Sequence, residues 1–259
     1  DHRDLHSFPT RRSSDLAIMN LLLGFIILSF LVGMRTTLPT TVISEFREGA
    51  ASNAQLQRYD KVLKINGSSV FTANDITFSM ISDKDGIVDF TILRDGKKME
   101  LPASDFGMQV TEDGTRIINL DFYVFSQQKT VWSGVKYTFL WMFSIVRQVW
   151  LSLANLITGN FTMSELSGPV GVSTAIGQAS SAGLNTLLML IGFITVNIGV
   201  FNLLPVPALD GGRLIFLLIE LVLRHPVNPK YEGFVHAAGF VALMGLMLVV
   251  TFNDIVRLF

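Results

Sequence analysis

Cysteine is absent from this sequence of 259 residues, which excludes disulfide bonds and thiolate metal ligands. Any metal would therefore be held by histidine, aspartate or glutamate, and the chain has only four histidines. Charged residues are also scarce, at 16% of the chain, whereas hydrophobic residues make up 49%. This composition is too apolar for an ordinary soluble domain and indicates several membrane segments. The net charge of −1 gives no reason to expect a nucleic-acid partner.

Three apolar runs are long enough to cross a bilayer as helices: residues 17–34, Leu184 to Leu204, and Gly233 to Phe252. The connection between the last two runs contains Arg213, Arg224 and Lys230, and the positive-inside rule, which counts lysine and arginine, places it in the cytoplasm. The gap before the second run contains "LSGPVGVSTAIGQASSAG", which is rich in glycine and serine. We expect this gap to be partly irregular in structure.

Residues 39–107 have a different character, with short β-branched runs and scattered charges. The pairs Asn66-Gly67, Asp85-Gly86 and Asp95-Gly96 are typical of tight turns between strands. We therefore predict a small β-rich domain with one or two short helices. Residues 108–128 are expected to extend it with another hairpin that turns at Asp113-Gly114.

Residues 129–158 are apolar and aromatic, but Lys129, Lys136 and Arg147 fall within a narrow arc of a helical wheel. Three tryptophans add the character of a membrane–water interface. This pattern favours an amphipathic helix that lies on the membrane surface rather than one that crosses it. If residues 129–158 do not cross, only the run Leu184 to Leu204 separates the β-rich domain from the cytoplasmic connection. The β-rich domain then lies outside the cytoplasm, and residues 17–34 cross back inward.

Asp210 is the strongest candidate for a functional residue, because it directly follows a long apolar run. The competing interpretation is that Asp210 caps the helix predicted from Gly211 to Leu223. Pro205 and Pro207 break the helix before it, and irregular backbone at membrane depth is tolerated only inside protein or beside a wet cavity. These surroundings favour the functional interpretation.

Three other features are weaker candidates. Asn202 could bind the extended backbone of a substrate or orient a ligand, or it could instead cap carbonyl groups freed near Pro205. Gly168-Pro169-Val170-Gly171 is a turn signal before it is a candidate site. His236 lies in the last apolar run without a partner at metal-ligand spacing, so we expect a hydrogen bond there rather than a metal.

The stretch "NLLPVPALDGGRLIFLLIE" resembles the second signature of bacterial site-2 proteases, which are zinc metalloproteases that cut within membranes. The likeness extends to "LSGPVGV" before it and "FVHAAGF…VTFNDIVRLF" after it, and covers roughly residues 17–259. The β-rich domain resembles the PDZ domain of these enzymes, with "YDKVLKINGSSV" matching the strand and turn after its helix. Tyr59 replaces a glycine that is usual there. The resemblance implies an α-helical polytopic protein of the bacterial cytoplasmic membrane, with an inserted β-rich, PDZ-like domain outside the cytoplasm.

By this resemblance, Asp210 is one of three ligands of a catalytic Zn²⁺, and residues 184–259 form the C-terminal membrane core that carries the LDGG motif. Asn202, Pro205 and Pro207 would lie where substrate is held. The other two ligands and the glutamate that acts as general base come from an HExxH motif on an earlier helix. Substrates of the family are single-pass membrane proteins, such as anti-sigma factors or signal-peptide remnants.

The opening tract "HRDLH" does not supply this motif, because Arg3 stands where the catalytic glutamate must be. Residues 1–16 resemble a translated sequencing adapter, so we expect them to be non-native. We also expect the chain to be a fragment that lacks its first helix and is inactive alone. The alternative is a catalytically silent membrane protein that binds peptides through its PDZ-like domain.

Overall fold

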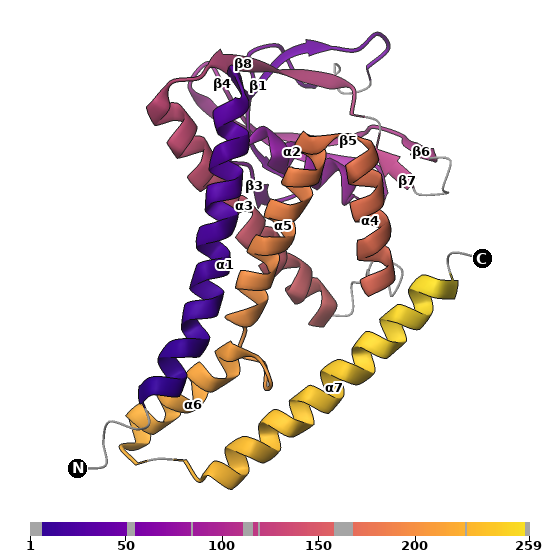
Figure 1. The fold of residues 1–259 in the computed structure, drawn as a ribbon. Helices are drawn as coiled ribbons and strands as arrows, with labels where there is room; N and C mark the ends of the chain where they lie inside the picture. The colour runs from indigo at the N-terminus through magenta and orange to yellow at the C-terminus, as the bar shows by residue number, and fades with distance from the viewer. Residues whose placement is uncertain are drawn as a thin grey trace. The chain divides into compact units, whose positions relative to one another are not determined.

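The computed structural model describes residues 7–50, 55–83, 85–110, 116–118, 120–157, 168–225 and 227–256 (Figure 1). Within these residues it contains seven helices and eight strands. The chain divides into two compact units, one formed by Asp1–Leu31 with Ile145–Phe259 and the other by Val32–Ser144. All the strands and helix α2 belong to the second unit.

Six strands of the second unit form an antiparallel sheet in the order β5-β4-β2-β1-β8, with the short β3 paired to β2. Strands β6 and β7 pair with each other apart from this sheet. The elements of this unit are β1 (Thr37–Phe46), β2 (Lys61–Ile65), β3 (Ser68–Ser69), α2 (Ala73–Ile81), β4 (Ile87–Arg94), β5 (Lys97–Asp105), β6 (Met108–Val110), β7 (Arg116–Ile118) and β8 (Phe122–Gln128).

The sheet has a hydrophobic core of its own. Along β4, Val88, Phe90 and Ile92 are buried, whereas Ile87 and Asp89 are exposed. This alternation is expected for a strand with one covered face. The same core takes up Leu56 from a loop and Met80 from α2. Each such burial contributes about 1.5–3 kcal/mol, so this unit has the apolar contacts of a separate domain.

Two of the predicted turns are confirmed as two-residue hairpin turns. Asn66 and Gly67 both have positive φ and connect β2 to β3, where Ile65 pairs with Ser68. Asp95 and Gly96 do the same between β4 and β5. Positive φ at both central residues defines the type I′ turn that Asn-Gly and Asp-Gly favour.

Residues 108–128 were expected to extend the domain with a hairpin, and β6 and β7 pair as antiparallel strands there. Only β6 and β7 stand apart from the main sheet, and the turn expected at Asp113-Gly114 lies outside the described residues. Strand β8 instead returns to the main sheet and pairs with β1 from Thr37–Gln128 to Phe46–Phe122. The local pattern of β8 indicates a strand, but its partner lies about 80 residues earlier and is chosen by tertiary packing.

The order of elements around α2 is also different from the expected one. The strand and turn of "YDKVLKINGSSV" precede α2, and no helix comes before them in the described residues of this domain. Tyr59, in this stretch, has a φ of 75°, a conformation that favours glycine. Tyr59, which stands where a glycine is usual, therefore adopts the left-handed backbone conformation that glycine favours.

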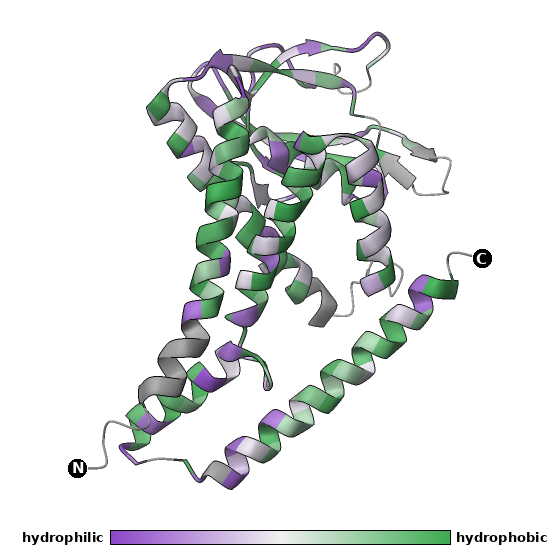
Figure 2. Ribbon diagram, in the orientation of Figure 1, coloured by the Kyte–Doolittle hydropathy of each residue, from purple (hydrophilic) through white to green (hydrophobic). Residues whose placement is uncertain are grey.

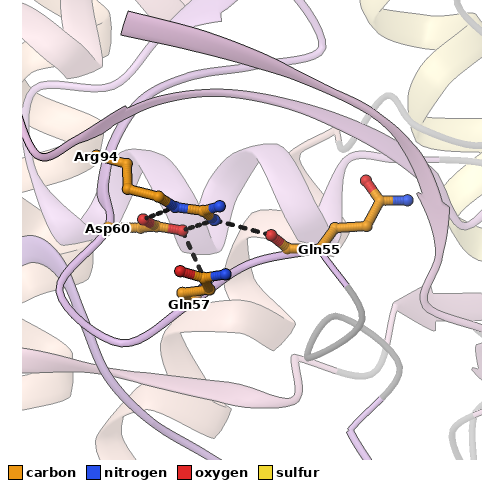
Figure 3. Close-up of polar contacts among 4 residues, drawn as sticks. All are labelled: Gln55, Gln57, Asp60 and Arg94. Carbon is orange, nitrogen blue, oxygen red and sulfur yellow. Dashed lines mark hydrogen bonds and ion pairs between the residues drawn. The ribbon is translucent and has the colours of Figure 1, made fainter. Parts of the chain in front are cut away.

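An ion pair between the partly exposed Arg94 and the buried Asp60 fixes the loop that contains Tyr59 (Figure 3). The Arg94 guanidinium donates from Nε and Nη2 to the two carboxylate oxygens of Asp60, at 2.8 and 2.7 Å. Asp60 also accepts a bond from the Gln57 amide at 2.8 Å, and Arg94 Nη2 donates to the Gln55 carbonyl at 2.9 Å. The hydrogen bonds to Asp60 raise the pKa of Arg94 above its usual value. The pair thus ties the loop before β2 to strand β4.

The remaining helices are α1 (Ser7–Met34), α3 (Val131–Ile157), α4 (Pro169–Ser181), α5 (Leu184–Asn202), α6 (Asp210–Leu223) and α7 (Pro229–Val256). Among the described residues, three segments are long and apolar enough to cross a membrane: Asp15–Met34, Leu184–Asn202 and Lys230–Val256. These are the three predicted runs, and Figure 2 shows their apolar character along α1, α5 and α7. Helix α1 begins ten residues before Ala17, within the tract expected to be non-native.

Helices α1 and α5 pack side by side in the first unit (Figure 1). A Cβ on Gly24 would lie 2.5 Å from Val196 Cγ2, and one on Gly199 would lie 2.9 Å from Leu21. Small residues of this kind allow helix backbones to approach closely in membranes, where burial of apolar surface adds little. The close approach of the two helices therefore depends on the small size of Gly24 and Gly199.

Most of the glycine- and serine-rich segment before α5, which we expected to be partly irregular, is helical from Pro169 to Ser181. Helix α4 begins directly after Gly168, with Pro169 at its first position. Proline is favoured there because its missing N–H would have no partner in the first turn. The turn signal in "GPVG" is thus a helix start.

Helix α3 runs through the segment predicted to be an interfacial helix, but one of its tryptophans does not face outward. Trp141 is 5% exposed, and the Arg35 guanidinium lies 5.6 Å from its ring centroid. On the same face, Ser144 hydrogen-bonds the buried carboxylate of Asp75 in α2. Trp132 is 78% exposed, so only part of the expected aromatic face is available to a membrane.

Candidate functional site around Asp210

The loop between α5 and α6 carries the predicted zinc ligand. Helix α5 ends at Asn202, the chain turns through Pro205 and Pro207, and Asp210 is the first residue of α6. Leu209 occupies the N-cap position, and no side chain caps this helix. Asp210 is therefore not the N-cap residue, and its half-buried side chain lies in the first turn of α6.

The glycine pair after Asp210 allows this loop to fold back on the start of α6. A Cβ on Gly211 would lie 2.1 Å from the Leu204 carbonyl oxygen, and one on Gly212 would lie 2.6 Å from that of Val206. Both contacts are with backbone atoms, which a side chain cannot displace cheaply. The glycines of the LDGG motif are thus required by the shape of the loop that presents Asp210.

Helix α7 supports the loop from its other side. A Cβ on Gly239 would lie 2.5 Å from Pro207 Cβ, so α7 and the loop are in close contact there. One turn earlier, His236 Nδ1 accepts a hydrogen bond from the Ala208 N–H at 2.9 Å. Ala208 has a φ of 76°, which is strained for a residue with a Cβ.

The hydrogen bond of His236 agrees with the sequence-based expectation, but its partner was not foreseen. His236 Nδ1 is an acceptor here, so the neutral ring carries its proton on Nε2. Nε2 is buried and has no hydrogen-bond partner among the described residues, and the nearest Glu232 oxygen lies 3.9 Å away. The spacing of His236 and Gly239, three residues apart on one face of α7, was the available signal.

Asn202 and the two prolines have different surroundings. Asn202 is half-buried at the end of α5. Its two suggested roles, in substrate binding and in capping freed carbonyl groups, both stay predictions. Pro207 packs against α7, whereas Pro205 is exposed.

A second carboxylate in the first unit anchors α4. Asp254 of α7 is 5% exposed, and its Oδ2 accepts hydrogen bonds from the Gly168 N–H at 2.9 Å and the Gly171 N–H at 2.8 Å. A Cβ on Gly168 would lie 2.9 Å from the same oxygen. The GPVG segment therefore holds a structural contact between α4 and α7 and is not a candidate active site.

The described residues do not by themselves fit a zinc ion. Zinc in proteins takes three or four converging nitrogen, sulfur or oxygen ligands. Among the residues that the structure describes, no group of three or more histidine, aspartate or glutamate side chains could hold a metal. Asp210 offers one suitable oxygen donor, and His2 and His6 of "HRDLH" lie outside the described residues.

Comparison with known proteins identifies the family. The model of peptidase family M50 matches residues 17–246, and this range includes the Asp210 loop. The chain belongs to peptidase family M50. This confirms the resemblance to site-2 proteases that the LDGG stretch indicated.

Several curated M50 relatives are similar over most of this chain. It is 37% identical over 239 residues to the zinc metalloprotease RasP of Geobacillus kaustophilus, with 92% of this chain and 56% of that protein covered. It is 34% identical over 245 residues to the regulator of sigma-W protease RasP of Bacillus subtilis, with 93% and 57% covered. A putative zinc metalloprotease of Clostridium perfringens is 32% identical, with 93% and 71% covered. The chain thus spans little more than half the length of the first two relatives.

Among solved structures, the PDZ domain of an SdrC-like protein from Listeria innocua is similar to part of the chain. It covers 35% of this chain and 97% of its own, at 15% identity and a TM-score of 0.27.

Proposed function

We propose that this chain is part of a zinc metalloprotease of the site-2 class, which hydrolyses peptide bonds of single-pass membrane proteins within the bilayer. The observation that carries this proposal is the placement of Asp210. It is a half-buried carboxylate at the start of α6, on a loop held by Gly211-Gly212 and α7, between two helices apolar enough to cross a membrane. Ionisable groups in such positions usually mark functional sites.

In this proposal Asp210 is one zinc ligand, and Asn202, Pro205 and Pro207 line the region that holds substrate. Bound zinc would supply Lewis acid chemistry and an activated water for peptide hydrolysis. The sequence contains no HExxH motif, so the other two ligands and the general base would come from residues outside it. The residues of this chain then contribute one donor atom and the loop that orients it.

We further propose that α1, α5 and α7 cross the bacterial cytoplasmic membrane and that the sheet domain lies outside the cytoplasm. The connection between α5 and α7 carries three basic residues in or beside it, and lysine and arginine favour the cytoplasmic side: Arg213, Arg224 and Lys230. Helix α3 is then an interfacial helix, because Trp132, Phe139 and Phe143 are exposed along one side with Lys136 among them.

The substrates would be single-pass membrane proteins or their remnants, such as anti-sigma factors or signal peptides. The Bacillus subtilis relative is named a regulator of sigma-W, which supports the first class. The sheet domain would act as a steric gate or a docking module in front of the membrane.

The alternative function is a catalytically silent membrane protein that captures peptides with its PDZ-like sheet. PDZ domains commonly bind a peptide as an added strand at a free sheet edge. Strand β1 has no free edge, because β2 pairs with one side and β8 pairs along the other. Within the described sheet the outer strands are β5 and β8, so capture at β1 would require β8 to leave. The pairing of β1 on both sides therefore disfavours peptide capture at that strand.

The first test is to sequence the genomic DNA upstream of the Ala17 codon. An in-frame apolar helix with HExxH would support the protease, whereas a start codon directly before the "HRDLH" tract would support the silent alternative.

The second test measures zinc bound to the longer protein. Asp210→Ala should lose bound zinc and cleavage of a single-pass substrate in proteoliposomes. Asp254→Asn alters another carboxylate of the same unit and should retain zinc, so equal zinc contents in both variants would contradict the assignment of Asp210.

A further inference from the structure

The loop that presents Asp210 holds a strained residue whose only side-chain partner in the described residues comes from another helix. Ala208 has a φ of 76°, and its N–H donates to His236 Nδ1 at 2.9 Å. A non-glycine residue in this region of φ costs about 1–2 kcal/mol and persists only where its surroundings hold it. His236 provides that support, since water is scarce as an acceptor inside a membrane segment.

We propose that His236 is a positioning residue that fixes the backbone of residues 205–209, and through it Asp210. Only Leu209 separates Ala208 from Asp210, so the Asp210 backbone has little freedom once the Ala208 amide is fixed. Gly239 strengthens the same contact, because its missing Cβ lets α7 approach Pro207. His236 is not proposed to bind the metal, since its Nδ1 is occupied by the Ala208 amide.

The rest of the His236 environment holds the ring in place. The Phe216 ring of α6 lies 5.6 Å from the imidazole, centroid to centroid, and Glu232 lies one turn earlier on α7. The imidazole therefore contacts both the loop before Asp210 and the helix after it. This arrangement resembles the outer-shell partners of metal ligands, which orient the ligand without touching the metal.

Only the expected effect of His236 on zinc binding rests on the proposed function. The contact between His236 and Ala208 can be tested without metal. We would measure hydrogen exchange at the Ala208 amide of this chain in lipid nanodiscs. His236→Ala removes the acceptor and should raise the exchange rate about tenfold, the factor that corresponds to one net hydrogen bond. His236→Asn places an amide oxygen near the position of Nδ1 and should keep the rate within about threefold of the wild type. His225→Ala, an exposed histidine outside this contact, is the matched control and should change nothing.

An unchanged rate in His236→Ala would overturn the proposal, and so would His236→Asn exchanging as fast as His236→Ala. Faster exchange spread evenly over α7 would also overturn it, because that result indicates lost packing rather than a lost loop contact. In the longer protein that carries HExxH, His236→Ala should weaken zinc binding about 10–100-fold. If Asp210→Ala leaves zinc unchanged while His236→Ala frees the Ala208 amide, the proposed function fails and the loop contact stands. If Asp210→Ala loses zinc but His236→Ala changes neither zinc binding nor exchange, the positioning role fails alone.

Discussion

Replacement of Asp254 tests whether a carboxylate fastens α4 to α7. Asp254 Oδ2 accepts two backbone N–H groups at 2.8 and 2.9 Å, and the side chain is 5% exposed. A hydrogen bond to a charged group contributes about 1.5–3 kcal/mol, and two bonds to one oxygen are not additive. We therefore expect Asp254→Ala to lower the free energy of unfolding by about 3 kcal/mol. Asp254→Asn keeps one acceptor oxygen without the charge and should cost about half as much.

The assay is unfolding of the chain from mixed micelles by increasing detergent denaturant, together with hydrogen exchange of the Gly171 amide. Both replacements should speed exchange at the start of α4 more than in α5. Phe252→Ala is the control, because this residue is 69% exposed and lies two positions away on α7. The reasoning would be refuted if Asp254→Ala stayed within about 0.5 kcal/mol of the wild type, the range of an ordinary surface substitution.

Two further predictions concern the sheet domain. Tyr59→Gly should be more stable than Tyr59→Ala by about 0.5–1 kcal/mol. Both variants lose the ring stacked on Phe125, but only glycine relieves the strain of the positive φ, and this gain exceeds the cost of its larger unfolded-state entropy. Pulse proteolysis of the domain measures the difference, and equal stabilities would show that the backbone is not strained. Asp60→Ala should destabilise the domain by about 3 kcal/mol, since it leaves the Arg94 guanidinium without its carboxylate and the Gln57 amide without its acceptor. Arg94→Lys, which keeps the charge but not the paired geometry, should cost less, and a larger loss than for Asp60→Ala would contradict this account.

The features that sequence predicted well are those encoded by neighbouring residues. Asn66-Gly67 and Asp95-Gly96 determine hairpin turns because both members of each pair tolerate positive φ. The three apolar runs follow from length and hydropathy alone, and Pro205 with Pro207 explains why α5 does not continue into α6.

The features that sequence missed depend on partners distant in the chain. Strand β8 pairs with β1 across about 80 residues, and nothing in the composition of residues 122–128 identifies that partner. The start of α4 is stabilised by Asp254, which follows it by more than 80 residues. The local sequence shows only Gly168 and Gly171, which are typical of a turn, and not their distant acceptor. The partner of His236 was also missed, because it is the backbone N–H of the distant Ala208, and the sequence of side chains gives no sign of it.

Helix α7 illustrates how polar contacts can orient a helix that buries little surface. Only 6% of its most apolar window is buried within the protein. Lipid can replace apolar contacts at no great cost, so such contacts do not fix the position of a membrane helix. A backbone N–H without an acceptor, in contrast, is costly where water is absent. Near opposite ends of α7, His236 accepts the Ala208 amide and Asp254 accepts those of Gly168 and Gly171. Lipid tails cannot accept a hydrogen bond from these backbone N–H groups. These two contacts therefore hold α7 to the loop of Asp210 and to α4.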